Sequence, residues 1–328
     1  MTRIAVLDDY QGLASLLPCW KRLEGRAEVQ TFRESVATEE ALVDRLRGFS
    51  IVVPIRERTQ FPGSLLKRLS DLKLLALTGR NSGHVDVSAA TSCGILVAET
   101  DSSPTSAFEL TIGLLLAAAR QIPREDRAVR AGGWQTSIGA ELSGKTLGIL
   151  GLGRIGARVA AAGHLFNMRV LASGLTLSDE RAAAAGATRA IIDDLFRESD
   201  FLSIHLRLSE RTRGIVTARH LSLMKPTAYL INTARGPLVD ESALVAALRE
   251  RRIAGAALDV YDIEPLPTPH PFRALDNVVL SPHMGYVTAE AYDRLFTQVV
   301  DNVARYLGGE LPLRTLNPEV MQRILKSS

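Results

Sequence analysis

Three ionisable side chains in the C-terminal half of the chain, Arg235, Glu264 and His283, have the types needed to bind an acid and to move a proton. Arg235 offers a planar fork of N–H donors that matches a carboxylate. Glu264 stands in the proline-rich segment YDIEPLPTPHP, which would present its carboxylate rigidly. His283 stands in a later loop and follows Pro282, which stiffens the chain there. An ionised carboxylate beside an imidazole favours the protonated ring and fixes its tautomer, so a Glu264–His283 pair would act as a general acid–base.

A glycine-rich turn in mid-chain has the spacing of a dinucleotide site. The apolar run 146–150 reads as a buried strand, and Gly151, Gly153 and Gly156 follow it in the pattern G-x-G-x-x-G, before a predicted helix over 158–166. Gly151 allows the turn, Gly153 lets the backbone approach a pyrophosphate at the helix N-terminus, and Gly156 lets the helix pack on the strand. A glycine-rich packing turn is the alternative, but the flanking strand and helix favour a dinucleotide. A hydride carrier, an acid–base histidine and an arginine suit the interconversion of 2-hydroxy and 2-keto acids.

Polar and ionisable side chains recur at the ends of the predicted strands. In an open parallel sheet the carboxyl ends of the strands border one crevice, and ligands bind there. Ordinary loop polarity, the alternative explanation, would not follow the strand ends in this way. The residues of this kind are Arg80, Asn81, Gly151, Arg235, Asp259 and His283.

Apolar runs alternate with segments of helical spacing along most of the chain, which predicts parallel α/β units. The predicted strands are 3–7, 50–55, 72–77, 94–98, 146–150, 169–172, 200–206, 228–232, 255–260 and 277–280. The predicted helices lie around 13–23, 65–69, 85–90, 107–120, 158–166, 182–186, 240–249 and 287–307. We expect Thr105 or Ser106 to cap the largely apolar helix 107–120, and Asp240 to cap the helix 240–249.

The composition fits a globular chain of about two domains and argues against several function classes. The 328 residues are 46% hydrophobic, and the formal net charge of +3 disfavours nucleic acid or an anionic membrane as the main partner. The apolar stretch 110–119 is too short to span a bilayer, and Asp8 and Asp9 leave no room for a signal-peptide core. Cys19 and Cys93 form neither a disulfide framework nor a metal-spaced pair, so we expect no metal site and a cytoplasmic protein.

Several motifs in order along the chain resemble those of the D-isomer-specific 2-hydroxyacid dehydrogenases. They are TGRNSGHVD at 78–86, AFELTIGLLLAAAR at 107–120, RAGGWQ at 130–135, KTLGILGLGRIG at 145–156, SIHL at 203–206, LMKPTAYLINTARGPLVDE at 223–241, GAALDVYDIEPLP at 255–267 and LSPHMGYVT at 280–288. The resemblance covers essentially the whole chain, and the block from 223 to 285 is highly specific. It implies hydride transfer between NAD(P)(H) and a small D-2-hydroxy acid or 2-keto acid.

The resemblance also implies a role for each matching residue. Arg235 resembles the family's substrate-orienting arginine, His283 its general acid–base, and Glu264 the partner of that histidine. Asn81 and Ser82 match the turn whose backbone N–H groups hold the substrate carboxylate. The positions that match cofactor-binding residues are Gly151, Gly153, Arg154, Ile155, Gly156, Ser173, His205, Thr212, Thr233, Ala234, Asp259 and Gly285.

The fold implied by the resemblance is α/β, with two doubly wound parallel-sheet domains. A Rossmann cofactor domain would be inserted into a flavodoxin-like substrate domain, which places the glycine turn in mid-chain. Residues 1–104 and 291–328 would form the substrate domain, and residues 105–290 the dinucleotide-binding domain. Members of the family are commonly dimers through the cofactor domain, so a homodimer is expected.

Two departures from the family pattern bear on specificity. NAD-preferring members carry an acidic residue at the end of the second cofactor strand, where this chain has Gly174. Ser173 and Thr176 could bond either cofactor, so NAD and NADP both stay open. Arg80 stands where small residues are common in the family; it could bind a second acidic group of the substrate or be a solvated charge.

Two other functions are compatible with the same motifs. The chain also resembles C-terminal-binding co-repressors, which sense a dinucleotide, keep the same three residues and act mainly as protein-binding scaffolds. The absence of a long disordered tail after the last predicted helix favours the enzyme. Formate dehydrogenases belong to the same superfamily but would need another residue in place of Glu264, which disfavours that activity.

Overall fold

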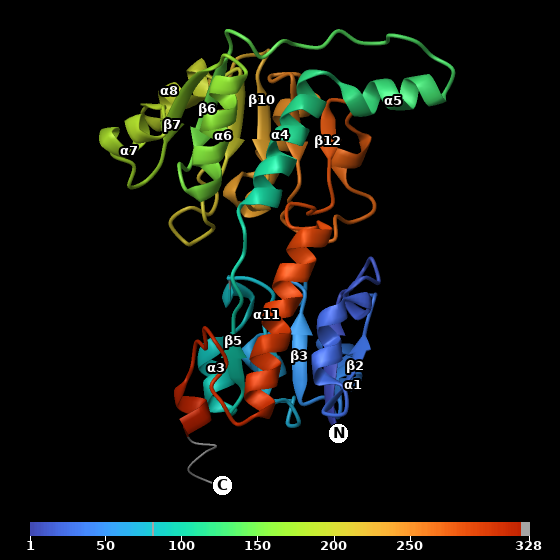
Figure 1. Cartoon of the computed structure of the whole chain (residues 1–328). Helices are drawn as coiled ribbons and strands as arrows, with labels where there is room; N and C mark the ends of the chain where they lie inside the picture. Colours follow the sequence, from blue (N-terminus) through green and yellow to red (C-terminus); the bar gives the residue numbers. More distant parts are fainter. Residues whose placement is uncertain (81, 323–328) are drawn as a thin grey trace. The chain divides into compact units, whose positions relative to one another are not determined.

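The computed structural model describes residues 1–80 and 82–322, which form two α/β units. Unit 1 comprises Met1–Ser103 and the chain from Thr288 onward, and unit 2 comprises Pro104–Val287. Each unit contains one sheet, and every strand pair within these sheets is parallel. The predicted fold class, two parallel-sheet α/β domains with one inserted into the other, is therefore confirmed (Figure 1).

The sheet of unit 1 has the strand order β2-β1-β3-β4-β5, which is the flavodoxin-like order. Its strands are β1 (Thr2–Leu7), β2 (Ala27–Thr31), β3 (Ile51–Pro54), β4 (Leu74–Ala76) and β5 (Leu96–Ala98). β3, β4 and β5 are buried along their whole length, which explains their continuous apolar sequences. β2 was not predicted, because it is a partly exposed edge strand with only one large apolar residue.

The helices of unit 1 differ from the prediction at the N-terminus. The segment around 13–23 forms two short 3-10 helices instead of one α-helix, and Pro18 begins the second of them. The helices are η1 (Ala14–Leu16), η2 (Pro18–Leu23), α1 (Glu39–Leu46), α2 (Gly63–Leu66), η3 (Ser82–His84), α3 (Val87–Ser92) and α11 (Ala289–Leu307). α11 returns from the far end of the sequence and packs on η2 and β4, with Arg22 and Asp301 forming an ion pair at 2.6 Å.

The sheet of unit 2 has the strand order β12-β11-β10-β9-β6-β7-β8. Its strands are β6 (Thr146–Leu150), β7 (Arg169–Ser173), β8 (Thr188–Arg189), β9 (Phe201–Ile204), β10 (Tyr229–Asn232), β11 (Gly255–Leu258) and β12 (Val278–Leu280). The chain reverses its direction of winding between β6 and β9, as it does in the Rossmann fold, and ligands of such sheets bind at that switch point. The glycine turn follows β6 and therefore lies at the switch point.

Helices cover both faces of this sheet (Figure 1). α4, α6 and α7 pack on the face that carries Ile149, and α8, α9 and α10 pack on the face that carries Leu150, as expected from the alternation of side chains along a strand. The helices of unit 2 are α4 (Thr105–Ala119), α5 (Ile122–Arg130), α6 (Arg154–Leu165), α7 (Asp179–Ala184), α8 (Ile192–Glu198), α9 (Ala218–Leu223), η4 (Gly236–Leu238), α10 (Glu241–Arg249) and η5 (Pro271–Ala274). No helix in the described ranges is both long and apolar enough to cross a membrane.

The predicted helix ends in unit 2 were partly wrong. The N-cap of α4 is Pro104 and no side chain caps it, so neither Thr105 nor Ser106 has the predicted capping role. α6 begins at Arg154, four residues earlier than predicted, with Gly153 as its N-cap. Asp240 caps α10 as predicted, since its side chain accepts a hydrogen bond from the N–H of Ala243.

Candidate active site

Three of the predicted site residues lie at one edge of the unit 2 sheet. Arg235 stands in the turn after β10, Asp259 directly follows β11, and His283 is three residues beyond the end of β12. β10, β11 and β12 are neighbouring parallel strands, so their carboxyl ends lie at the same edge (Figure 1). The sheet thus brings an arginine, a carboxylate and an imidazole to one end of three adjacent strands.

Glu264 and His283 form a close pair. Nδ1 of His283 lies 2.5 Å from Oε2 of Glu264, and Oε1 of the same carboxylate accepts a hydrogen bond of 2.9 Å from the N–H of Tyr261. A carboxylate accepts hydrogen bonds only, so Nδ1 carries the ring proton in this pair. Nε2 is then the nitrogen that can exchange a proton with another molecule, and the imidazole is 23% exposed.

The backbone of His283 has an unusual conformation. Its φ of 56° lies in the left-handed region, which is uncommon for residues other than glycine and often marks a functional site. Asp259 holds this turn: Oδ1 accepts hydrogen bonds from the hydroxyl of Ser281 at 2.6 Å and the N–H of Met284 at 2.7 Å, and Oδ2 accepts one from the N–H of Gly285 at 2.9 Å. Asp259 is fully buried, and burial raises the pKa of its carboxyl against the opposing effect of these hydrogen bonds.

The turn that carries Arg235 is built by a buried asparagine. Nδ2 of Asn232 donates to the carbonyl of Arg235 and its Oδ1 accepts from the N–H of Ala234, both at 3.0 Å. Thr233 shares a 2.7 Å hydrogen bond with Thr111 of α4, which fixes the turn to the helix. Asn232 was not among the predicted site residues, although an asparagine at a strand end is a recognisable turn-forming signal.

The glycine turn has the close contacts that its spacing predicts. Gly151 has a φ of 104°, and a Cβ there would lie 2.7 Å from the backbone of His205. A Cβ on Gly156 would lie 2.4 Å from the carbonyl oxygen of Gly151, whereas the space above Gly153 is open for 4 Å. No side chain caps α6, a helix of 12 residues, so the N–H groups of its first turn, including those of Arg154 and Ile155, suit the pyrophosphate of a dinucleotide.

The remaining predicted cofactor residues of this unit surround the same switch point or close nearby loops. Ser173 ends β7 and its carbonyl accepts a hydrogen bond from the N–H of Gly151, while the N–H of His205 donates to Leu150. Desolvation of the His205 ring lowers its pKa to about 4, and its Nε2 lies 2.8 Å from the hydroxyl of Ser203. Thr212 is buried, and its hydroxyl closes the preceding loop by donating to the carbonyl of Arg207 at 2.7 Å.

The predicted substrate residues of unit 1 follow β4. Arg80 pairs with Asp101 at 2.6 Å, and both side chains are about half exposed, so this guanidinium already has an anionic partner. Arg314 binds the same carboxylate. Asn81 lies outside the described residues, and Ser82 begins η3. Among the described residues, no group of His, Cys, Asp and Glu side chains could hold a metal ion.

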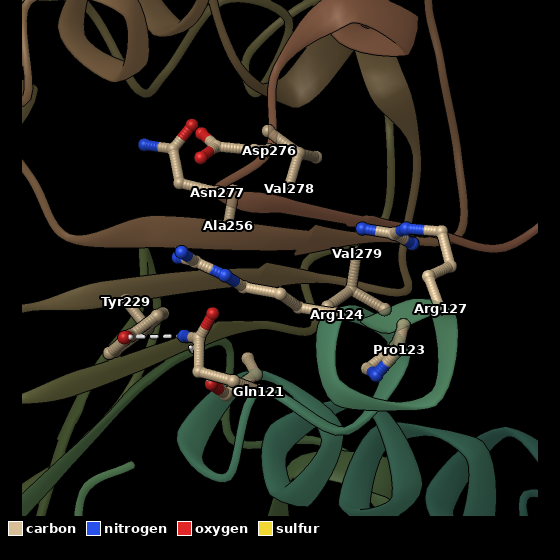
Figure 2. Close-up of a pocket in the computed structure, with 11 residues that line it drawn as sticks. Gln121, Pro123, Arg124, Arg127, Tyr229, Ala256, Asp276, Asn277, Val278 and Val279 are labelled. Carbon is tan, nitrogen blue, oxygen red and sulfur yellow. Dashed lines mark hydrogen bonds between the residues drawn. The ribbon is translucent and has the colours of Figure 1, made fainter. Parts of the chain in front are cut away.

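A pocket in unit 2 lies at the opposite end of the strands from His283. Figure 2 shows Tyr229, Ala256 and Asn277 lining it, and these residues stand at or near the starts of β10, β11 and β12. Its other wall is formed by the end of α4 and by α5, where Gln121 donates a 2.9 Å hydrogen bond to the hydroxyl of Tyr229. This pocket is separate from the edge that carries the predicted site.

The fold and the glycine turn define a dinucleotide-binding α/β protein. Residues 112–285 match the family model described as D-isomer specific 2-hydroxyacid dehydrogenase, NAD binding domain. A glyoxylate reductase from Aeropyrum pernix is 42% identical over 268 residues, which cover 79% of this chain and 80% of that protein. The chain belongs to the D-isomer-specific 2-hydroxyacid dehydrogenase family, whose nicotinamide-dinucleotide-binding members are oxidoreductases.

Two further similarities agree with this assignment. A D-3-phosphoglycerate dehydrogenase from Methanocaldococcus jannaschii is 37% identical over 295 residues, which cover 88% of this chain. The chain spans only 56% of the length of that relative. The crystal structure of a phosphoglycerate oxidoreductase from Vibrio cholerae superposes with a TM-score of 0.91 at 40% identity, covering 94% of this chain and 99% of that one.

The pKa of His205 predicts an acid-dependent loss of stability. The pKa of His205 in the folded protein, about 4, lies below the usual value of 6.5. The neutral ring therefore makes its full contribution to the free energy of unfolding above pH 6.5, and this contribution is lost as the pH falls towards 4. We expect His205→Gln, which has no titratable ring, to lose stability less steeply than the wild type over this range, by up to about 1.4 kcal/mol per pH unit. Urea unfolding of both proteins at several pH values measures this. A stability difference that does not change with pH would contradict the prediction.

Proposed function

We propose that the protein interconverts a small 2-keto acid and the corresponding D-2-hydroxy acid with NAD(P)(H). The observation that carries this proposal is the 2.5 Å pair between Nδ1 of His283 and Oε2 of Glu264, at the sheet edge that also holds Arg235. The names glyoxylate reductase and D-3-phosphoglycerate dehydrogenase of the relatives support a short 2-keto acid as the substrate class.

In the direction of reduction, Arg235 binds the carboxylate and the carbonyl oxygen of the keto acid. Its guanidinium stabilises the negative charge that develops on that oxygen. A nicotinamide bound in unit 2 would supply the hydride to the carbonyl carbon. Nε2 of His283 donates the proton to the oxygen, and Glu264 stabilises the imidazolium before transfer. In the direction of oxidation, neutral His283 takes the hydroxyl proton.

The proposed cofactor site is formed by the turn from Gly151 to Gly156, which receives the pyrophosphate. The resemblance to the family assigns contacts with the rest of the cofactor to Ser173, His205, Thr212, Thr233, Ala234, Asp259 and Gly285. It assigns the substrate carboxylate to the backbone of Asn81 and Ser82. For Asp259, the contact with the cofactor would be added to the three hydrogen bonds that it accepts from the His283 turn.

A turnover screen tests the proposed function. Glyoxylate, hydroxypyruvate, phosphohydroxypyruvate, pyruvate and phenylpyruvate are each offered with NADH and with NADPH, and nicotinamide absorbance is followed. We expect turnover of at least one short 2-keto acid. Bound dinucleotide without turnover of any of these acids would instead favour the scaffold function of the co-repressor type, which a peptide pull-down would then examine.

Replacing the proposed acid–base should abolish turnover without unfolding the turn. We choose His283→Asn because asparagine tolerates the left-handed conformation that this position adopts. We expect kcat to fall by about 10²- to 10⁴-fold, the usual contribution of general acid–base catalysis, with the dissociation constant of NADH unchanged. His164→Asn, at an exposed histidine of α6, is the control. Retention of wild-type kcat in His283→Asn would exclude the acid–base role.

The end of β7 bears on the choice between NADH and NADPH. Gly174 occupies the position of the acidic residue of NAD-preferring members, and a Cβ there would meet its nearest neighbour, Leu177, at an ordinary 3.6 Å. A side chain therefore fits without displacing the backbone. Because no carboxylate at this position repels a 2′-phosphate, we infer that the site accepts NADPH in addition to NADH.

We expect Gly174→Asp to weaken NADPH binding about tenfold or more, because like charges placed together cost several kcal/mol and 1.4 kcal/mol is a factor of ten. NADH binding should be unchanged or tighter. Quenching of protein fluorescence gives both dissociation constants without turnover. Gly174→Asn, of the same size but neutral, is the control. An unchanged ratio of the two constants in Gly174→Asp would contradict the inference.

The arm after α5 supports self-association through unit 2. The segment 131–141 follows α5 as an extended chain (Figure 1) and is held in place by Glu125, whose carboxylate accepts hydrogen bonds from Thr136 and Ser137. Its apolar side chains point outward: Trp134 is 76% exposed and Ile138 98% exposed. A fixed arm that presents large apolar groups to solvent is typical of a protein-protein contact, and a second copy of the chain is the partner that the family resemblance favours.

We expect the wild type to sediment as a dimer and the double variant Trp134→Ser, Ile138→Ser as a monomer, because the substitutions remove apolar area from the contact. Sedimentation velocity at micromolar concentration measures this. Leu165→Ser changes a residue of unit 2 that is also highly exposed, at 84%, and should leave the dimer intact. A monomeric wild type, or a variant that stays dimeric, would overturn the proposed interface.

A further inference from the structure

The loop that carries Glu264 has few backbone N–H groups with which to hold itself in place. The loop comprises residues 262–271 and runs between two residues with buried side chains, Tyr261 and Phe272. Residues 262–265 are exposed. Four of these ten residues are prolines, at 265, 267, 269 and 271, and they have no N–H group to donate. Arg273 binds the carbonyls of Leu266 and Pro267 at 2.7 and 2.9 Å, which fixes the middle of the loop.

One carboxylate connects the two ends of this loop. Oε2 of Glu241 accepts a hydrogen bond from the N–H of Asp262 at 3.3 Å, and Oε1 lies 3.0 Å from Nε2 of His270. Nδ1 of His270 accepts a hydrogen bond from the N–H of Phe272, so Nε2 carries the proton and donates it to Glu241. The side chains of His270 and Glu241 are only 13% and 24% exposed, so water weakens this contact little.

Glu241 also belongs to the segment that carries Arg235. It is the first residue of α10, six residues after Arg235 in the chain. Between them, Gly236 lies directly against the loop: a Cβ at this position would be 2.0 Å from the carbonyl carbon of Tyr261 and 2.6 Å from the nitrogen of Asp262. The Arg235 turn and the start of the Glu264 loop therefore touch through their backbones, and Glu241 bonds the two segments at that point.

We propose that Glu241, together with His270, is a positioning residue that holds the Glu264 loop against the Arg235 turn and so sets the Glu264–His283 pair. This role rests on the proposed function, because its consequence for catalysis requires that His283 is the acid–base. Glu241 does not need to touch the substrate; it acts through Glu264.

A double-mutant cycle tests this role. Glu241→Gln keeps the size of the side chain but leaves only one acceptor oxygen for two donors. We expect it to lower kcat about tenfold, to shift the midpoint of the pH–rate profile in the same direction as Glu264→Gln, and to leave the dissociation constant of NADH unchanged. In a Glu264→Gln background, Glu241→Gln should lower kcat by less than about twofold, because the group through which it acts is already neutral. Equal losses in both backgrounds would show a merely structural role and overturn the proposal.

Two matched variants complete the kinetic test. Glu198→Gln removes a carboxylate that pairs with Arg169 at 2.5 Å in the same unit, and it should change neither kcat nor the pH profile. His270→Gln keeps an N–H donor that can reach Glu241 and should restore most of the kcat that His270→Ala loses. No recovery in His270→Gln would count against the hydrogen bond as the cause.

Hydrogen exchange separates this proposal from the proposed function. In Glu241→Gln, the amides of Asp262 and Phe272, which bond to Glu241 and to His270 at the two ends of the loop, should exchange at least about tenfold faster, while those of the central strands stay protected. This result does not require turnover. If the wild type turns over no keto acid but the loop exchanges faster in the variant, the proposed function fails and the contact remains. If exchange in the loop is unchanged, the positioning role is wrong whatever the activity.

Discussion

The geometry of the candidate site depends on one buried carboxylate. Asp259 accepts hydrogen bonds from the N–H groups of Met284 and Gly285 and thereby holds His283 in the left-handed region. That conformation costs about 1–3 kcal/mol for a residue other than glycine. Hydrogen bonds to a charged group contribute about 1.5–3 kcal/mol each, so two of them can outweigh the cost. The imidazole faces Glu264 because a residue at the end of the neighbouring strand fixes the backbone beneath it.

Close backbone contacts give the same edge its remaining shape. At the switch point, Gly151 lets the turn after β6 approach the backbone of His205, and Gly156 lets α6 approach Gly151. Gly236 does the same between the Arg235 turn and the Glu264 loop. None of these contacts would be possible with a side chain in the way, since a Cβ would lie within 2.7 Å of the neighbouring backbone atoms. The glycines therefore set how closely the loops approach one another. The parallel pairing of the strands sets only the order of the loops along this end of the sheet.

The parts of the site that could be predicted are those with a local pattern. Buried parallel strands are continuous apolar runs, so their ends, and Arg235 and His283 beyond them, could be located from the sequence. Glu241 and His270 could not, because their roles come from contacts made across the fold; they are 29 residues apart. Asn232 was missed although its hydrogen bonds, to Ala234 and Arg235, are local. The edge strand β2 was missed because its partial exposure leaves no continuous apolar run. The helical segment predicted around 13–23 is divided into two 3-10 helices, the second of which begins at Pro18. The proposed acceptance of both cofactors rests on Gly174, a position that matters because it carries no charge.

Three carboxylates near this edge have different tasks because they have different partners. Asp259 is fully buried and accepts hydrogen bonds from N–H and O–H groups of the turn that carries His283, so its carboxylate serves that backbone. Glu241 divides its two oxygens between the ends of a loop. Glu264 gives one oxygen to the N–H of Tyr261 and the other to an imidazole, which makes it the only one of the three bonded to His283 among the contacts described for this edge. A neutral amide at each position removes an acceptor in every case, but only at Glu264 does it remove a charge that is bonded to the His283 imidazole. If His283 is the acid–base that we propose, the response of the pH profile, more than the loss of rate, distinguishes the carboxylate that stabilises its charged ring from those that hold the loops in place.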